Sequence, residues 1–249
     1  MRILSAVLAA LLLALAGCGG ADDDTLTVSA AASLKKALTQ YGGEFEDATA
    51  RFSFAGSDEL AAQIRKGAKP DVFASANTKL PDELHKEGLV ERPVTFAGNR
   101  LVLAVPAEGS DVASLNDVER AGTTLAIGSE SVPVGSYTRA VLAKLPESES
   151  SKVLKNVRSE EPDVAGIVGK LTQGAVDAGF VYLSDVRATG GELKAIELPD
   201  TLQPTVAYGA AVVKGTGHED AANAFIDGLL DGDGKAALDA AGFEPPPAQ

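Results

Sequence analysis

Short apolar runs alternate with amphipathic segments along the first third of the chain. Residues 26–31, 51–55 and 71–76 are compact apolar or alternating runs that predict β-strands. After each run, apolar residues recur at helical spacing, and the last of these helices is predicted over residues 81–87, before Gly88. This alternation of strands and helices implies a parallel sheet that is covered by helices on both faces.

Serine marks the predicted start of the first two helices. Ser33 and Ser57 each follow a strand directly, so we interpret both as N-caps, and Gly67 as the residue that ends the second helix. Such a junction presents a hydroxyl group and unpaired backbone N–H groups at the positive end of a helix dipole. It therefore favours the binding of an anion without a cationic side chain.

Two long extended segments, residues 93–106 and 205–214, interrupt this rhythm and predict crossings between two lobes. The resulting α/β organisation is lobe 1 from residues 25–102 and 205–249, and lobe 2 from residues 103–204. Two lobes with two crossings form a hinged clamp, and the alternative is one uninterrupted doubly wound sheet. The elements predicted after the first crossing are helices over 114–120, 135–145, 148–156 and 163–171, strands over 124–127, around Val157 and over 178–182, a short helix from Ser184, and closing helices over 222–230 and 235–240.

The N-terminal segment predicts a lipoprotein signal peptide over residues 1–17. Arg2 precedes an apolar stretch over residues 3–15, which is too short to span a bilayer, and Leu-Ala-Gly-Cys then ends at Cys18. We expect lipidation of Cys18 and a polar tether over residues 18–24, which would anchor the protein to the cell membrane on its extracytoplasmic side. A cysteine that follows an ordinary signal peptide by chance is the alternative. Cys18 is the only cysteine, so no disulfide forms within the chain.

The formal net charge of −13 argues against a nucleic-acid partner. It is also the wrong sign for long-range attraction of an anion. An anionic ligand must therefore be held by local dipoles and oriented N–H groups.

The second lobe offers three further candidates for ligand contacts. Residues 128–135 form a small, turn-rich loop before a helix, and residues 160–164 form another strand–helix junction with Asp163 as the predicted cap. Tyr182 ends a predicted strand. Each feature alone is more often structural than functional. Their position at the ends of successive strands, where open α/β sheets bind ligands, favours a shared site.

The residues that carry a resemblance to a known family are segments 29–34, 52–57, 61–64, 67–76, 98–103, 132–135 and 163–164. In this order they resemble the molybdate-binding proteins of ABC transporters, over essentially the whole chain after the signal peptide. The resemblance implies a two-lobed type II periplasmic-binding-protein fold, with mostly parallel sheets joined by two crossover strands. It also implies molybdate or tungstate as the ligand, no cofactor, and an ABC permease with its ATPase as partners. We expect a monomer.

The resemblance further implies which groups contact the oxyanion. Ser33 and Ser57 would each contribute a hydroxyl and a backbone N–H, Val134 and Val164 a backbone N–H, and Tyr182 its phenolic hydroxyl. A fully deprotonated tetrahedral dianion only accepts hydrogen bonds, so a shell of donors suits it.

Acidic residues depart from the pattern of this family at two places. Asp58 stands where relatives often have hydroxyl residues, and a carboxylate that faced the cleft would repel a dianion. We expect its side chain to point outward from the first turn of the helix, where it stabilises the helix dipole. The pair Glu160 and Glu161 raises the same question less sharply.

An enzyme is the competing functional class. His85 and His218 are the only histidines, both in polar helix-end contexts, and no nucleophile-elbow, zinc-protease or P-loop pattern occurs. No spacing typical of a bound metal cation is present either. The main alternative to molybdate is therefore a clamp for sulfate or phosphate, and a hydrolase or a surface interaction protein is less favoured.

Overall fold

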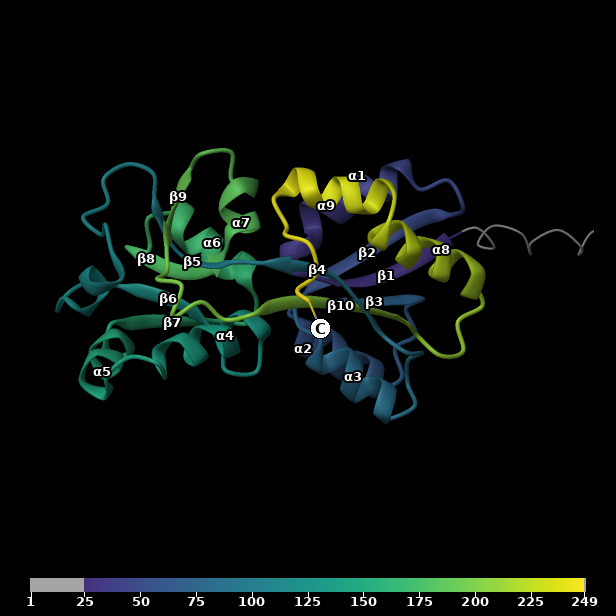
Figure 1. The fold of residues 1–249 in the computed structure, drawn as a ribbon, viewed down its shortest axis with the longest axis horizontal. Helices are drawn as coiled ribbons and strands as arrows, with labels where there is room; N and C mark the ends of the chain where they lie inside the picture. Colours follow the sequence, from purple (N-terminus) through teal and green to yellow (C-terminus); the bar gives the residue numbers. More distant parts are fainter. Residues whose placement is uncertain (1–24, 249) are drawn as a thin grey trace, which may run out of the picture.

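The computed structural model describes residues 25–248. The predictions for residues 1–24, which comprise the signal peptide, lipidation of Cys18 and the tether, lie outside the described residues. The described part folds into two lobes, each built around a five-stranded sheet (Figure 1). The alternative of one continuous sheet is therefore wrong.

The first lobe contains a sheet with strand order β2-β1-β3-β10-β4. Helices α1, α8 and α9 lie on one side of this sheet and α2 and α3 on the other (Figure 1). The strands are β1 Thr25–Ala31, β2 Thr49–Ala55, β3 Val72–Ser75, β4 Val94–Asn99 and β10 Val206–Val212, and the helices are the 3-10 turn η1 Ala32–Leu34, α1 Lys35–Glu44, α2 Ser57–Arg65, α3 Lys79–Lys86, α8 Glu219–Leu230 and α9 Asp233–Ala241.

The second lobe contains a sheet with strand order β7-β6-β8-β5-β9. Helix α4 lies on one side of this sheet and α6 and α7 on the other (Figure 1). The strands are β5 Leu101–Pro106, β6 Leu125–Gly128, β7 Val157–Glu161, β8 Ala178–Tyr182 and β9 Leu193–Glu197, and the helices are the 3-10 helix η2 Leu115–Glu119, α4 Pro133–Leu142, α5 Glu147–Lys155, α6 Val164–Thr172 and α7 Leu183–Ala188.

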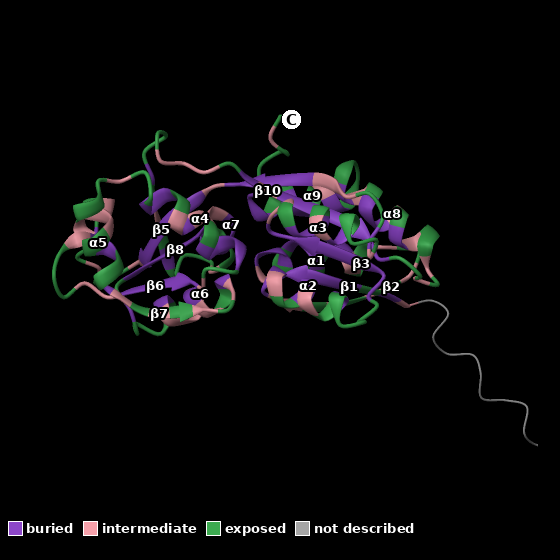
Figure 2. Ribbon diagram, turned by 90° about the horizontal axis from the view of Figure 1, so that it is seen from below, coloured by how far each residue is buried: buried purple, intermediate pink, exposed green. Residues whose placement is uncertain are grey.

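Each sheet is mostly parallel, as expected. β10 pairs antiparallel with β3 and β4, and β5 pairs antiparallel with β8 and β9, so one strand in each sheet opposes the other four. These two strands lie in the predicted crossings. The inner strands β3, β6 and β8 are buried along their whole length, while exposure is concentrated on the outer helices and loops (Figure 2).

The largest differences from the predicted elements lie at two places. The first crossing is two strands rather than one extended segment, because the chain leaves the first sheet at Asn99 and enters the second at Leu101. β9 was not predicted at all. Its residues 193–197 alternate only partly between buried and exposed positions, and it lies at the edge of its sheet beside β5.

The two lobes repeat one hydrogen-bonded pair at the beginning of equivalent strands. Thr27 donates from its backbone N and its Oγ1 to Asp71 Oδ2 over 2.6 and 2.7 Å, and Thr124 donates in the same way to Asp177 over 2.7 and 2.7 Å. Only Asp71 gains further donors, from Thr216 Oγ1 and from His218 Nδ1. The repeat ties the start of the central strand to its parallel neighbour in each lobe.

We expect Asp71→Asn to destabilise the protein at neutral pH. Burial raises the pKa of Asp71, but hydrogen bonds from Thr216, Thr27 and His218 outweigh it, and the net pKa lies below the usual 3.8. A lowered folded-state pKa stabilises the protein above the unfolded-state value and loses that effect as the pH falls below about 4. Thermal unfolding should therefore show a loss of about 1–3 kcal/mol at pH 7 that shrinks towards pH 3.

The matched control for this prediction is Asp177→Asn, because Asp177 makes the same contacts with Thr124 from an exposed position. Its effect on the free energy of unfolding should be smaller. Equal losses for both variants at pH 7, independent of pH, would contradict the role assigned to Asp71.

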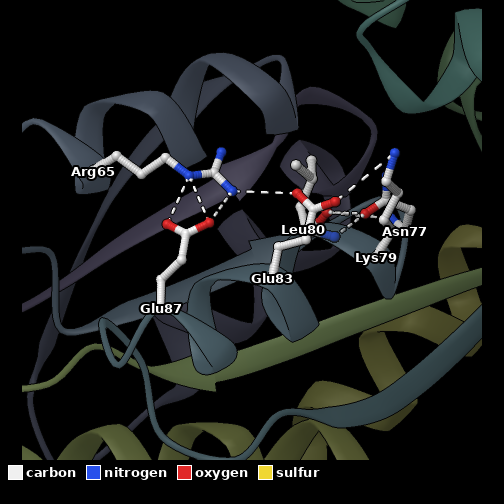
Figure 3. Close-up of polar contacts among 7 residues, drawn as sticks. Arg65, Asn77, Lys79, Leu80, Glu83 and Glu87 are labelled. Atoms are coloured by element: carbon white, nitrogen blue, oxygen red, sulfur yellow. Dashed lines mark hydrogen bonds and ion pairs between the residues drawn. The ribbon is translucent and has the colours of Figure 1, made fainter.

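A charged cluster holds α2 against α3 on the outer side of the first lobe. Arg65 Nη2 lies 3.2 Å from Glu83 Oε2 and 2.8 Å from Glu87 Oε1 (Figure 3). At the other end of α3, the backbone N of Leu80 donates to Asn77 Oδ1 over 3.0 Å. The ion pairs are about one-third exposed and so stabilise only modestly. Their structural effect is to fix α2, whose N-terminus lies at the site described next.

Candidate functional site

A small cavity lies where the two lobes meet, at the carboxyl ends of their parallel strands. Its volume is about 20 Å³, whereas pockets for drug-sized organic molecules measure roughly 300–1,000 Å³. The cavity therefore suits a ligand of a few atoms. It is lined from the first lobe by Ala31, Ala32, Ser33, Ala55, Gly56, Ser57 and Ala76, and from the second by Val132, Pro133, Val134, Asp163, Val164 and Tyr182.

All five residues predicted as ligand contacts line this cavity. Ser33 and Ser57 follow β1 and β2 in the first lobe, Val134 and Val164 begin helices in the second lobe, and Tyr182 ends β8. Two lobes therefore contribute to one site, as the clamp interpretation requires.

Ser33 does not cap a helix, contrary to the prediction. It lies inside the 3-10 turn η1, whose N-cap is Ala31, and α1 begins two residues later at Lys35. Its Oγ instead lies 3.0 Å from the hydroxyl of Tyr208 on β10. Tyr208 thus holds the hydroxyl of Ser33 on the side away from the cavity, and the other side of this hydroxyl faces the cavity.

Ser57 is likewise not an N-cap. Gly56 occupies that position, and Ser57 is the first residue of α2. Its Oγ accepts a hydrogen bond from the backbone N of Ala76, just after β3, over 3.1 Å. Because the oxygen already accepts, the hydrogen of this hydroxyl is free to be donated into the cavity.

Tyr182 carries a buried hydroxyl that has no hydrogen-bond partner among the described residues. The side chain is 1 % exposed and lines the cavity. Burial raises the pKa of this phenol well above its usual value, with smaller contributions from Tyr208, Tyr137 and Asp185, so it stays protonated. A buried donor without a partner requires an explanation, and a bound acceptor in the cavity supplies one.

Val134 and Val164 lie in the first turns of α4 and α6, where backbone N–H groups have no partner within the helix. Pro133 begins α4, and the predicted cap Asp163 accepts from Gly166 N over 2.9 Å at the start of α6. With α2, three helices of nine or ten residues direct their N-termini at the cavity. Their dipoles supply local positive potential in a chain of net negative charge.

The carboxylates near the cavity are mostly turned away or engaged. Asp163 lines it but accepts a backbone hydrogen bond. Glu160 pairs with Arg139 over 2.8 Å and Glu161 with Lys170 over 3.5 Å, and neither lines the cavity. The half-exposed Glu160 is therefore a surface residue, whereas Glu161 is 13% exposed and packs against the start of α6.

Asp58 does not line the cavity, but it does not point fully into solvent as expected. Its Oδ1 is buried and without a partner among the described residues. A Cβ placed on Gly56 would lie 2.4 Å from the carbonyl oxygen of Pro162 and 2.9 Å from this Oδ1. Asp58 thus lies at the seam between the lobes, and Gly56 allows them to approach closely.

Three groups near the site were not predicted, and they are Gly56, the backbone N of Ala76 and Tyr208. Each acts through a contact that joins distant parts of the chain. Ser33 and Tyr208, for example, are separated by 175 residues. A small residue at 56 between a strand and a helix was the only local signal. Tyr208 lay in a segment interpreted solely as a crossing.

Asp185 lies behind Tyr182 and is buried. Its Oδ2 accepts from the backbone N of Tyr182 over 3.0 Å. Burial raises the pKa of Asp185 to about 7; the backbone hydrogen bond lowers it, and the charge of Asp163 raises it. This raised pKa means that ionisation of Asp185 opposes folding.

We expect Asp185→Asn to stabilise the protein at pH 8 and to have less effect at pH 4–5. The unfolded chain ionises near the usual value of 3.8 and the folded chain near 7. Parent stability therefore falls as the pH rises from about 4 to about 7. Asparagine stays neutral and still accepts the Tyr182 N–H. Thermal unfolding from pH 4 to 8 measures the effect, and Asp231→Asn at an exposed position is the control. A difference in the free energy of unfolding between Asp185→Asn and the parent that stayed constant over this range would contradict the prediction.

The described residues place neither a metal-binding cluster nor a histidine at this cavity. Residues 25–248 contain no group of three or more histidine, cysteine or acidic side chains arranged to hold a metal ion. His218 pairs with Asp71 over 3.1 Å and His85 with the Val90 carbonyl over 3.1 Å, both away from the cavity. Within the same residues, no helix combines the length and apolar character needed to cross a membrane.

Comparison with known proteins places nearly all of the described residues in one family. Residues 26–244 match the family model for the bacterial extracellular solute-binding protein. The molybdate-binding protein ModA of Mycobacterium tuberculosis is 34% identical over 228 residues, which cover 89% of this chain and 85% of the relative. A putative ABC transporter substrate-binding lipoprotein, YvgL of Bacillus subtilis, is 32% identical over 88% of this chain and 86% of its own length.

A solved structure shares the fold. The periplasmic molybdate-binding protein of Azotobacter vinelandii superposes with a TM-score of 0.79 at 23% identity, over 89% of this chain and 100% of that chain.

Proposed function

Because the chain belongs to the bacterial extracellular solute-binding protein family, we propose that it captures molybdate between its two lobes for delivery to an ABC transporter. The observation that carries this proposal is the convergence of donors from both lobes on one cavity of about 20 Å³. The name of the mycobacterial relative, a molybdate-binding protein, supplies the ion.

The proposed contacts are the hydroxyls of Ser33, Ser57 and Tyr182 and the backbone N–H groups of Val134 and Val164. Molybdate and tungstate are tetrahedral dianions of nearly the same size, so we include tungstate as a ligand. Both ions only accept hydrogen bonds, which matches a set of donors. The Ser57 oxygen already accepts from Ala76 N, and the Ser33 hydroxyl is held by the hydroxyl of Tyr208. The donors themselves suit sulfate equally well, so discrimination against sulfate would come from the size of the closed cavity.

The proposed mechanism is capture by closure. The two lobes would move about the two crossings, and the ion would exchange its water for fixed donors. No bond is made or broken, so we propose a binding protein rather than an enzyme. It would act as a monomer that docks on an ABC permease driven by an ATPase.

We further propose that Cys18 is lipidated and tethers the protein outside the cytoplasmic membrane. The sequence Leu-Ala-Gly-Cys at residues 15–18 supports this, as does the lipoprotein among the relatives. Metabolic labelling with a radioactive fatty acid should mark the parent and leave Cys18→Ser unlabelled. Label on both would refute the site.

A thermal-shift series tests the ligand. The chain without residues 1–18 should melt at a higher temperature with molybdate or tungstate, by an amount that corresponds to about 4 kcal/mol at a thousandfold excess over Kd. Sulfate, phosphate and chloride should produce little change. A shift with sulfate or phosphate alone would retain the clamp and change its cargo, and no shift with any oxyanion would refute the proposal.

A further inference from the structure

A chain of buried polar side chains runs from Ser33 to the crossings between the lobes. The Tyr208 hydroxyl lies 3.0 Å from Ser33 Oγ and 3.5 Å from Asn99 Nδ2, and that Nδ2 lies 2.8 Å from Ser184 Oγ. All four residues are buried. Tyr208 lies on β10 and Asn99 at the end of β4, the two strands that lead to and from the second lobe, whereas Ser184 belongs to α7 of the second lobe.

The orientation of the Asn99 amide determines which atom donates in each of these hydrogen bonds. Asn99 Oδ1 accepts from the backbone N of Arg100 over 2.9 Å, which identifies the other amide atom as the donor. Asn99 Nδ2 therefore donates to the oxygens of Ser184 and Tyr208. The oxygen of Tyr208 is then an acceptor, and its single hydrogen is donated to Ser33 Oγ. The hydrogen of Ser33 is left for the cavity.

We propose that Tyr208 and Asn99 are positioning residues that hold the Ser33 hydroxyl as a donor to the bound oxyanion. The proposal rests on the function proposed above. Neither residue lines the cavity, so both act through Ser33. Through the contact of Asn99 with Ser184 on α7, this series of hydrogen bonds also links Ser33 to the second lobe.

Removal of the Tyr208 hydroxyl should change selectivity as well as affinity. Without its donor, Ser33 Oγ is free to turn and to accept a hydrogen bond. Tyr208→Phe should therefore bind molybdate about 3- to 10-fold more weakly. The same variant should discriminate less against hydrogen phosphate, which carries a proton to donate, so the ratio of the two Kd values should fall. A purely structural loss would weaken both ions alike.

A double-mutant cycle provides the decisive test, with titration calorimetry of molybdate on the parent, Ser33→Ala, Tyr208→Phe and the double variant. If Tyr208 acts through Ser33, the Kd of the double variant for molybdate equals that of Ser33→Ala within about twofold. Additive losses would overturn the proposal. Phenylalanine keeps the ring that packs 5.3 Å from Phe243 and 5.8 Å from Tyr182, so we expect the variant to fold.

Two further variants complete the test. Tyr137→Phe is the control. It removes a hydroxyl from a ring that lies 6.4 Å from the ring of Tyr182 and takes no part in the hydrogen bonds between Ser33 and Ser184. Its loss of affinity for molybdate should be zero or should add to the loss caused by Ser33→Ala. If Tyr208→Phe does not fold, Asn99→Leu takes its place in the same cycle with the same expectation.

Failure of the proposed function shows itself at the first step. If the parent binds sulfate but not molybdate, the cycle is run with sulfate, and additivity there overturns the positioning role alone. If the parent binds no oxyanion, both proposals fall.

Discussion

Gly56→Ala is expected to weaken molybdate binding at least tenfold without unfolding the protein. The added Cβ would lie 2.4 Å from the Pro162 carbonyl oxygen, closer than non-bonded carbon and oxygen approach. Pro162 belongs to the second lobe, so the lobes must separate by several tenths of an ångström to admit the methyl group. Hydrogen bonds from both lobes to one small ion cannot all keep their length after such a shift. Titration calorimetry measures the loss.

The backbone at Gly56 does not itself require glycine. Its φ of −60° and ψ of 135° are accessible to any residue, so alanine adds no backbone strain. Within the first lobe the methyl group would approach Asp58 Oδ1 to 2.9 Å, and this end of a side chain can turn aside. Gly43→Ala is the matched control, since a Cβ there meets nothing within 4 Å. If Gly56→Ala bound molybdate like the parent, ligand capture would not need the close approach of the lobes seen here.

The sequence predicted which residues line the cavity better than it predicted the contacts that hold them. Apolar runs placed Ser33, Ser57 and Tyr182 at the ends of parallel strands, and strand ends of one sheet converge whatever the details of the turns. Capping was predicted wrongly for both serines because a serine before a helix is compatible with several hydrogen-bond partners. The partner chosen, Tyr208 for Ser33, comes from β10 and is set only by the tertiary fold.

The same distinction explains the errors in the fold. The break between β4 and β5 is the single residue Arg100, so the two strands look like one continuous extended segment in the sequence. β9 pairs only with β5 and carries Lys194 and Glu197, so its short pattern resembles a loop. Long-range pairing decides such segments, and local propensity does not contain that information.

Ser57→Ala and Ser33→Ala should each reduce affinity for molybdate by about 1.5–3 kcal/mol, which is about 10- to 150-fold in Kd. Each hydroxyl oxygen already has a partner, so each hydrogen is available to the ion. Alanine removes one charge-assisted hydrogen bond and leaves an oxygen of the dianion without its donor. Titration calorimetry measures the affinity, and Ser53→Ala, at an exposed position on β2, is the control and should bind like the parent.

The two serine variants should differ in the stability of the ligand-free protein. Ser57→Ala also leaves the buried N–H of Ala76 without its acceptor, which costs stability, and Ser33→Ala leaves the Tyr208 hydroxyl without its acceptor. Thermal unfolding without ligand measures these costs separately from affinity. If both variants bound molybdate as tightly as the parent and differed only in stability, the serines would be structural and the ion would lie elsewhere. If affinity falls as expected, each serine hydroxyl has two roles. Its oxygen accepts a hydrogen bond from the protein, which orients the hydroxyl, and its hydrogen is donated to the ion.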